Sequence, residues 1–294
     1  MSLDYRDRTI RLVASDLDGT FLNPQEKVTP RLKEAINRII AADCGFVIAT
    51  GRPPRWLAPV VDQLDYAPLC ICANGAMVID PNRDEITASH RLAPDAAAHI
   101  VEVATTLFHG RGTTGFAVER GGDVGQSPAV DSFFISPDYT HIWQPEGKAP
   151  GETVAPNIVG LDELTSQPVV KLLVRNVDFT SRDIFDALAA HIPAGTAHMT
   201  FSIPDGLVEI AAPGVTKRMG LEDVARQRGI TRGSIIAFGD MPNDTEMLQW
   251  AGIGVAMGNA DEKVKLIADI VCADNAHDGV AGILEEILGP TTGP

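Results

Sequence analysis

Four short segments of the chain carry side chains that could bind a metal ion and a phosphate group. The first is Asp16-Leu17-Asp18-Gly19-Thr20, directly after the apolar run at residues 10–15. Two carboxylates at this spacing can converge on one centre if the chain turns after a strand, and Gly19 permits such a turn. Carboxylate oxygens suit Mg²⁺, and an aspartate can also act as a nucleophile or a general acid. Alone, such a pair is more often a turn or a helix cap.

The second segment is Gly239-Asp240-Met241-Pro242-Asn243-Asp244, which follows the apolar run at residues 234–238. It supplies two further carboxylates and the amide of Asn243. Asn243 or Asp244 could simply cap the helix expected at residues 243–250. Capping does not explain a second carboxylate cluster that also follows a strand, so the two segments together indicate a metal site.

The remaining two segments suit an anion. Thr50-Gly51-Arg52 follows the apolar run at 46–50, and a hydroxyl beside a glycine N–H makes a small anion cradle to which Arg52 can add charge. Lys217, in Gly214-Val215-Thr216-Lys217, stands at the start of a predicted helix, where the helix dipole already attracts anions. A solvated lysine is an equally good interpretation of Lys217 by itself. Metal-binding carboxylates combined with phosphate-binding groups describe metal-assisted phosphoryl transfer.

The elements that must position these segments are short buried strands alternating with helices. Strands are expected at residues 10–15, 46–50, 69–73, 234–238 and 252–257, and helices at 216–228, 243–250, 261–268 and 279–288. A further helix is expected from Pro30, with Thr29 as its N-cap and Gly45 as its C-cap. This alternation predicts parallel βαβ units, whose ligands bind where the strands end. The four segments, and Asn74 after the strand at 69–73, should therefore share one sheet edge.

The middle of the chain has a different pattern of expected helices and strands. A helix is expected at residues 94–109, a strand at 168–175, a helix at 181–191 with Ser181 as N-cap, and a hairpin of 199–203 with 207–211. Residues 110–165 hold few clear elements. We predict a core domain from residues 1–84 and 213–294, interrupted by an inserted α+β domain at 85–212.

Composition excludes several classes of protein. The 294 residues carry a formal net charge of −15, which argues against a partner that is a nucleic acid or an anionic membrane surface. The chain holds no run of eighteen apolar residues and no signal-peptide pattern at its start. Its four cysteines are too few for a disulfide scaffold, and its scattered histidines predict no zinc site. We expect a cytoplasmic enzyme.

The order of the motifs resembles that of the haloacid dehalogenase (HAD) superfamily. DxDGT, a strand ending in T-G-R, NGA, GV-x-K, GDxxND and GVAMGNA follow one another from Asp16 to Ala260, and Asp278-Gly279-Val280 resembles a final DGV element. The resemblance is greatest to the Cof-type phosphatases, which have a large inserted C2-type cap. It implies an α/β fold with a Rossmann-like core, a parallel sheet and an α+β cap. Family members usually carry glycine after the motif lysine, where this chain has Arg218.

The resemblance also implies a role for each matched residue. Asp16 would be the nucleophile that forms an aspartyl-phosphate, and Asp18 the general acid and base. Mg²⁺ would be held by the Asp16 carboxylate, the Asp18 backbone carbonyl and Asp240. Thr50 and Lys217 would bind the phosphoryl group. The remaining matched residues would brace the metal or its waters, help to position Lys217, or line the phosphate and substrate side; they are Leu17, Gly51, Arg52, Asn74, Asn243 and Asp244.

These roles imply a Mg²⁺-dependent phosphatase for small phosphorylated metabolites, with sugar phosphates as the first choice of substrate. Phosphorylated cofactors such as pyridoxal phosphate or flavin mononucleotide are also open. A phosphomutase of the phosphomannomutase type and a non-catalytic binding protein on the same scaffold remain as alternatives. The intact set of Asp16, Asp18, Lys217 and Asp240 favours an enzyme. Substrate choice is expected in the inserted domain, and neither its specificity residues nor the oligomeric state can be inferred from the sequence.

Overall fold

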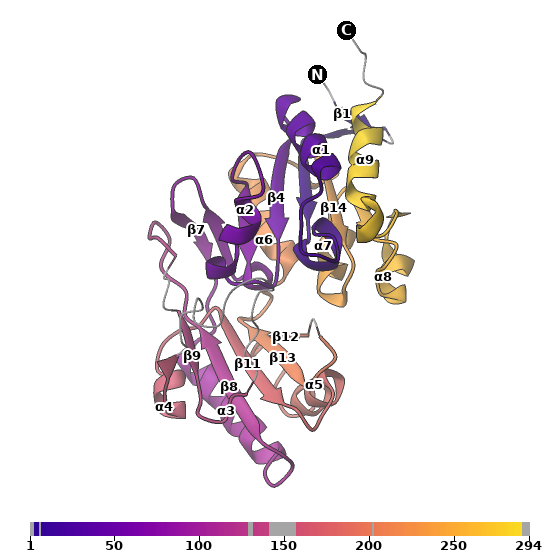
Figure 1. Ribbon diagram of the computed structural model, residues 1–294. Helices are drawn as coiled ribbons and strands as arrows, with labels where there is room; N and C mark the ends of the chain where they lie inside the picture. Colours follow the sequence, from indigo (N-terminus) through magenta and orange to yellow (C-terminus); the bar gives the residue numbers. More distant parts are fainter. Residues whose placement is uncertain (1–2, 6, 129–131, 141–156, 202, 290–294) are drawn as a thin grey trace. The chain divides into compact units, whose positions relative to one another are not determined.

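The computed structural model describes residues 3–5, 7–128, 132–140, 157–201 and 203–289. The chain folds as two compact units (Figure 1). Unit 1 comprises residues 1–88 and 216–294, and unit 2 comprises residues 89–215. Unit 2 is therefore inserted between the two halves of unit 1.

Unit 1 is built on an eight-stranded sheet. In spatial order its strands are β16 (Ile270–Val271), β15 (Ile253–Ala256), β14 (Ile235–Gly239), β3 (Leu12–Ser15), β4 (Gly45–Ala49), β5 (Leu69–Cys72), β6 (Met77–Asp80) and β7 (Glu85–Ser89). The strands from β16 to β5 are parallel to their neighbours, as predicted. β6 pairs with β5 in the antiparallel direction, so the parallel sheet has an antiparallel edge. Because β3 and β14 are buried throughout, they read as continuous apolar runs.

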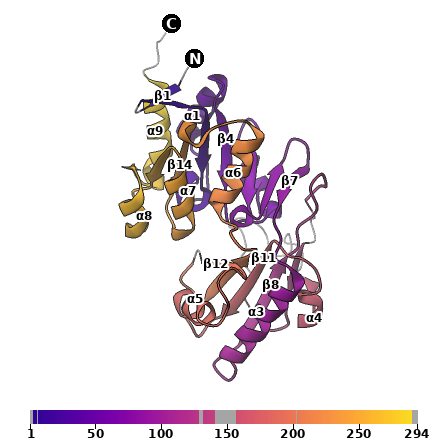
Figure 2. The same cartoon turned by 180° about the vertical axis from the view of Figure 1, so that it is seen from behind.

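Helices cover both faces of this sheet (Figures 1 and 2). α1 (Pro30–Ala41) and α9 (Gly279–Leu288) lie together on one face, and α6 (Lys217–Gln227) and α7 (Thr245–Trp250) lie together on the other. The shorter helices are α2 (Ala58–Val61) and α8 (Glu262–Ile267). A small antiparallel ribbon of β1 (Leu3–Tyr5) and β2 (Arg8–Ile10) completes the unit. This is a doubly wound α/β sheet, in which ligands bind beyond the carboxyl ends of the strands.

The first helix begins where the sequence predicts and ends differently. Thr29 is its N-cap, and the Thr29 hydroxyl accepts a hydrogen bond from the Leu32 N–H at 3.1 Å. The prediction that Gly45 is the C-cap is wrong, because Gly45 is the first residue of β4. Asp43, with φ of 63°, adopts the left-handed conformation just past the helix instead. Aspartate tolerates this conformation better than most side chains, so the glycine is free to begin the strand.

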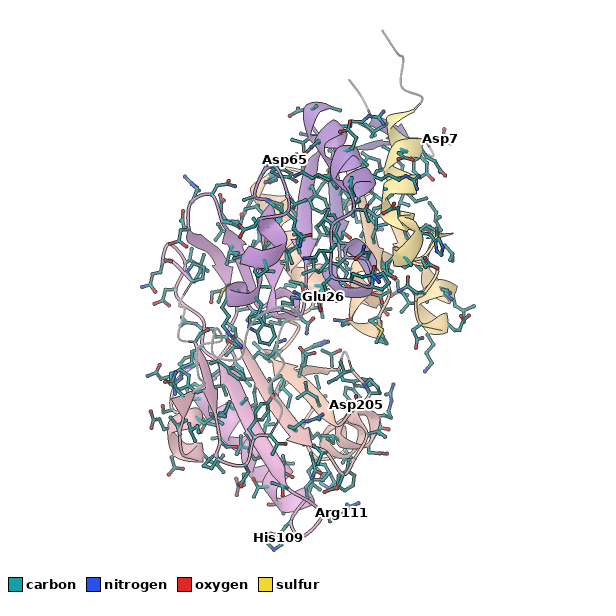
Figure 3. All side chains as sticks on the ribbon, viewed as in Figure 1. Asp7, Glu26, Asp65, His109, Arg111 and Asp205 are labelled. Atoms are coloured by element: carbon teal, nitrogen blue, oxygen red, sulfur yellow. The ribbon has the colours of Figure 1, made fainter. Side chains whose placement is uncertain are left out.

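Unit 2 is an α+β unit with one six-stranded sheet. Its strands, in spatial order, are β10 (Asn157–Ile158), β9 (Phe133–Ile135), β8 (Thr114–Glu119), β11 (Lys171–Asn176), β13 (Leu207–Ala211) and β12 (His198–Thr200). Its helices are α3 (Pro94–Leu107), α4 (Leu161–Leu164) and α5 (Ser181–Ala189). Figure 2 shows α3 against one face of the sheet. β12 and β13 form the predicted hairpin, and Asp205, labelled in Figure 3, lies in their connecting turn.

Two features of unit 2 differ from the prediction. The N-cap of α5 is Thr180 and not Ser181: the Thr180 hydroxyl accepts from the Asp183 N–H at 3.1 Å, and the Asp183 carboxylate accepts from the Thr180 N–H. This reciprocal capping box selects the earlier residue. The second feature is β8, a central strand within residues 110–165, where the sequence shows few elements. Residues 129–131 and 141–156 of that segment lie outside the described residues.

Cys44, Cys70 and Cys72 are buried free thiols, and Cys272 is a half-buried one. Within the described ranges, no helix combines the length and apolar character needed to cross a bilayer.

Candidate active site

Two neighbouring strands bring the two carboxylate segments together. β3 and β14 are paired in parallel, and the Asp16 N–H donates to the Phe238 carbonyl at 3.0 Å just beyond the pairing. The chain turns after Asp16 through Gly19, whose φ is 79°. A Cβ atom at Gly19 would lie 2.3 Å from Oδ2 of Asp240. A glycine is therefore required here for both backbone conformation and space.

Lys217 joins the two carboxylate segments. Its ammonium donates to Oδ1 of Asp16 at 2.5 Å and to Oδ1 of Asp244 at 2.7 Å. All three side chains are buried, and Lys217 is only 1% exposed. Lys217 is the first residue of α6, and the N-cap Thr216 fixes the start of that helix by accepting from the Met219 N–H. The lysine is therefore a buried, paired charge and not a solvated one.

Asp244 braces both the lysine and the neighbouring loop. While its Oδ1 accepts from Lys217, its Oδ2 accepts from the backbone N–H groups of Asp240 and Met241, each at 3.0 Å. Both oxygens are thus engaged by protein groups. Of the two roles that the sequence leaves open for Asp244, this geometry favours positioning of Lys217 and of the Asp240 loop.

The electrostatics of the cluster reflect an excess of buried negative charge. Burial raises the pKa of Asp16 well above its usual range, with Asp244 adding to the rise and Lys217 opposing it. Burial and the nearby Asp244 likewise raise the pKa of Asp240 to about 6. Burial alone would lower the pKa of Lys217, but Asp16 and Asp244 outweigh it, so the pKa is raised and the lysine stays charged. The site is built to receive positive charge.

The chemistry of this donor set fits a divalent cation. Oxygen atoms of Asp16, Asp240 and Asp244 lie within 4.8 Å of one another. The ammonium of Lys217 is paired with two of them, Asp16 and Asp244. Three carboxylates and one ammonium leave an excess of two negative charges, which one divalent ion would balance. Oδ1 of Asn243, in the same loop as Asp240, is buried with no hydrogen-bond partner among the described residues. Hard oxygen donors of this kind are those that Mg²⁺ prefers.

Asp18 differs from Asp16 in exposure and in partner. Its side chain is 52% exposed, and both of its carboxylate oxygens accept from Arg52, with Nε of Arg52 2.9 Å from Oδ2. Arg52 also lies 3.5 Å from Glu26, which Figure 3 labels. Burial would lower the pKa of Arg52, but the bond to Asp18 raises it overall. A half-exposed carboxylate beside a buried nucleophile candidate suits proton exchange with a leaving group.

The predicted phosphate-side residues meet at the ends of β4 and β5. The Thr50 hydroxyl, almost fully buried, accepts from the Arg52 N–H at 3.0 Å. Asn243 Nδ2 donates to Oδ1 of Asn74 at 3.0 Å, and a Cβ atom at Gly51 would lie 3.2 Å from that same oxygen. These loops therefore lie in contact with one another, although Arg52 is engaged with Asp18 and Asn74 with Asn243.

Two other predicted positions lie away from the polar cluster. Leu17 is fully buried as part of the core, so its side chain anchors the turn between the two aspartates. Arg218 is exposed and pairs with Glu222 at 3.5 Å, one turn further along α6. The departure from the family pattern at Arg218 therefore lies on the helix surface.

Three residues with contacts at the site were not singled out in the sequence. The Thr20 hydroxyl donates to Oδ1 of Asp240 at 3.0 Å. Asn259 Nδ2 donates to the Gly19 carbonyl at 2.8 Å. Glu26 is the third, through Arg52. Thr20 and Asn259 stand inside quoted motifs, which was a usable signal, whereas no pattern pointed to Glu26.

Comparison with known proteins defines the class. A family profile for haloacid dehalogenase-like hydrolases matches residues 13–284, so the chain belongs to this family. It is a phosphoric monoester hydrolase, and phosphatase activity on small phosphorylated compounds is the activity of its relatives. The match includes the whole of unit 2 as well as the carboxylate cluster.

The relatives include phosphatases with different named substrates. One relative is the 5-amino-6-(5-phospho-D-ribitylamino)uracil phosphatase YitU of Bacillus subtilis. The two sequences are 29% identical, and the alignment covers 94% of this chain and 96% of YitU. Another is the pyridoxal phosphate phosphatase YbhA of Escherichia coli, which is also 29% identical, over 93% of this chain and 97% of YbhA. Among solved structures, the HAD phosphatase BT1666 of Bacteroides thetaiotaomicron matches with a TM-score of 0.74 at 23% identity, covering 95% of each chain. The subclass IIB sugar phosphatase BT4131 matches at 0.73 and 22%, covering 94% of this chain and 98% of its own.

Proposed function

We propose that this protein is a Mg²⁺-dependent phosphatase that hydrolyses small phosphorylated metabolites through a covalent intermediate on Asp16. The observation that supports this best is the buried cluster of Asp16, Asp240 and Asp244, in which the Lys217 ammonium donates to Asp16 and Asp244. A nucleophilic carboxylate beside a fixed cation, at the carboxyl ends of parallel strands, is suited to attack on a phosphate monoester.

In the proposed reaction, a carboxylate oxygen of Asp16 forms a bond to phosphorus as the bond to the leaving oxygen breaks. Asp18, which must carry a proton at this point of the cycle, gives that proton to the leaving oxygen and becomes a carboxylate. Asp18 then takes a proton from water, whose oxygen attacks phosphorus, breaks the bond to Asp16 and releases inorganic phosphate. Lys217 and Thr50 hold the phosphoryl oxygens throughout both steps.

Mg²⁺ would be held by the Asp16 carboxylate, the Asp18 backbone carbonyl and Asp240. When bound, it supplies Lewis-acid charge that offsets repulsion between the carboxylates and the phosphate dianion. Asp244 holds Lys217 and the Asp240 loop in place. Thr20 holds Asp240 from the other side.

We propose unit 2 as the cap domain that determines which phosphoester is accepted. Relatives of this length act on a phosphoribityl compound and on pyridoxal phosphate, and BT4131 is a sugar phosphatase. Sugar and polyol phosphates are therefore our first choice of substrate, followed by phosphorylated cofactors. The four free cysteines support a reducing, cytoplasmic setting.

The test is a phosphate-release screen over sugar phosphates, polyol phosphates and phosphorylated cofactors, with Mg²⁺ and with a chelator. We expect release that needs Mg²⁺ and that ranks sugar or polyol phosphates first. Release that is unchanged by the chelator would contradict the metal dependence. Transfer of the phosphoryl group between two positions of a sugar, without release, would indicate a mutase instead.

A further inference from the structure

The turn that follows β5 has an unusual backbone. Ala73, Asn74 and Gly75 have φ values of 50°, 56° and 100° in succession. Among the described residues, no other run of three consecutive positive φ angles occurs. Left-handed conformations at non-glycine residues each cost free energy and persist where surrounding contacts hold them in place, often at functional sites. The contacts made by residues 73–75 therefore show what keeps this turn in its left-handed conformation.

The backbone of the turn is bonded to the Thr50 loop. The Asn74 N–H donates to the Thr50 carbonyl and the Ala73 N–H to the Arg52 carbonyl, both at 3.0 Å. An extended chain leaving β5 could not point these two N–H groups back at the end of β4. The left-handed conformation directs them there, so it holds this turn against the backbone of the Thr50 loop.

The side chain of Asn74 reaches a third loop. Its Oδ1 accepts from Nδ2 of Asn243 at 3.0 Å, and Asn74 is only 5% exposed. Asn243 stands between Asp240 and Asp244 in the loop after β14. One buried amide thus ties the phosphate-side loop to the loop that carries the metal-binding carboxylates.

The third residue of the turn lies against α6. A Cβ atom at Gly75 would lie 2.0 Å from the carbonyl oxygen of Thr216, the residue before Lys217. One turn along the helix, a Cβ atom at Gly220 would lie 2.3 Å from Cγ2 of Ile71 in β5. The N-terminus of α6 is therefore placed by close backbone contact with this turn, and Lys217 is placed with it.

We propose that residues 73–75 form a positioning element that sets the relative places of Thr50, Asn243 and Lys217, with Asn74 acting through the Asn243 amide. In this role Asn74 does not contact the phosphate. The proposal rests on the phosphatase function proposed above and assigns a role to the Asn-Gly-Ala segment of the sequence.

A double-mutant cycle tests whether Asn74 acts through Asn243. Asn74→Gly deletes the side chain and its amide but keeps a residue that adopts the left-handed conformation readily, so folding is expected. Asn243→Ala removes the other half of the bond. Asp43→Gly is the matched control, because Asp43 has φ of 63° and lies at the opposite, amino end of β4. The readouts are kcat and KM with p-nitrophenyl phosphate, and the affinity for inorganic phosphate by calorimetry in the presence of Mg²⁺.

We expect Asn74→Gly and Asn243→Ala each to lower kcat/KM by about tenfold or more, the effect typical of a lost positioning bond near reacting groups. The double variant should lie within about twofold of the worse single variant, because both remove the same bond. Inorganic phosphate should bind more weakly to each, and Asp43→Gly should match the wild type.

Two results would overturn the proposal. One is an Asn74→Gly protein with wild-type kcat/KM and phosphate affinity. The other is a double variant whose loss equals the product of the two single losses, since that would make Asn74 act independently of Asn243. A wild-type protein that binds phosphate but turns over no ester would count against the phosphatase function itself, and the calorimetric cycle would still test the positioning role.

Discussion

The excess negative charge at the site makes a measurable prediction for Asp240→Asn. Burial and Asp244 raise the pKa of Asp240 to about 6 from an unfolded value of 3.8, so the folded protein holds the ionised form unfavourably. Asparagine has the same shape, carries no charge, and keeps an oxygen that can accept from Thr20. The substitution should therefore stabilise the metal-free protein while it removes a proposed Mg²⁺ ligand.

The magnitude and its pH dependence follow from linkage. A rise of about 2 pKa units corresponds to about 3 kcal/mol of lost stability above the folded pKa. Because the folded state binds the proton more tightly, this loss is absent well below the unfolded pKa and grows as the pH rises through about 6. The free energy of unfolding of metal-free Asp240→Asn should thus exceed that of the wild type by about 3 kcal/mol near pH 7.5 and by about 1 kcal/mol near pH 4.5. For a unit of this size, the larger value corresponds to about 6 °C or more in Tm.

Thermal unfolding with and without Mg²⁺ provides the assay. Near pH 7.5 without metal, Asp240→Asn should melt above the wild type, and Mg²⁺ should stabilise the wild type but not the variant. Asp62→Asn is the control, because it removes the same formal charge from an exposed position. Equal melting temperatures at both pH values, or equal stabilisation of both proteins by Mg²⁺, would refute this account of the cluster.

Two further substitutions probe other parts of the site. Arg52→Gln removes the guanidinium that holds Asp18 in place. It should lower kcat/KM for an alkyl phosphate about tenfold more than for p-nitrophenyl phosphate, because the alkoxide is the poorer leaving group and needs a correctly placed general acid. Equal losses with the two substrates would argue against Arg52 as the residue that positions Asp18. Lys217→Met should abolish turnover and destabilise the metal-free protein by about 3 kcal/mol, because Asp16 and Asp244 lose their buried counter-charge. A urea midpoint at or above that of the wild type would contradict the pairing.

The sheet, and the fact that the polar segments meet at one of its edges, could be predicted because both depend on short local sequence patterns. Short apolar runs such as β3 and β14 are buried throughout, and polar residues stand directly after them. Parallel pairing then brings their ends to one edge whatever the detailed packing. The closeness of Asp16 to Asp240 and Lys217 follows from this rule, although the chain separates Asp16 from Lys217 by 201 residues.

The partners within the site could not be predicted in the same way. Arg52 was expected on the phosphate side, but its guanidinium forms two bonds with Asp18, and Glu26 lies within reach as well. Such choices depend on side-chain geometry across loops, and no spacing encodes them. The helix ends show the same limit: Thr180 and Ser181 can both cap α5, and only the reciprocal bond with Asp183 decides between them.

The central claim is that Asp16 is the nucleophile, and the most direct test compares the wild type with Asp16→Asn. Both proteins would be assayed for Mg²⁺-dependent release of p-nitrophenol, and the wild type would be quenched in acid to look for phosphate bound covalently to the peptide that contains Asp16. We predict turnover and labelled peptide in the wild type, and neither in the variant. Turnover by purified Asp16→Asn at a rate comparable to the wild type would contradict the account.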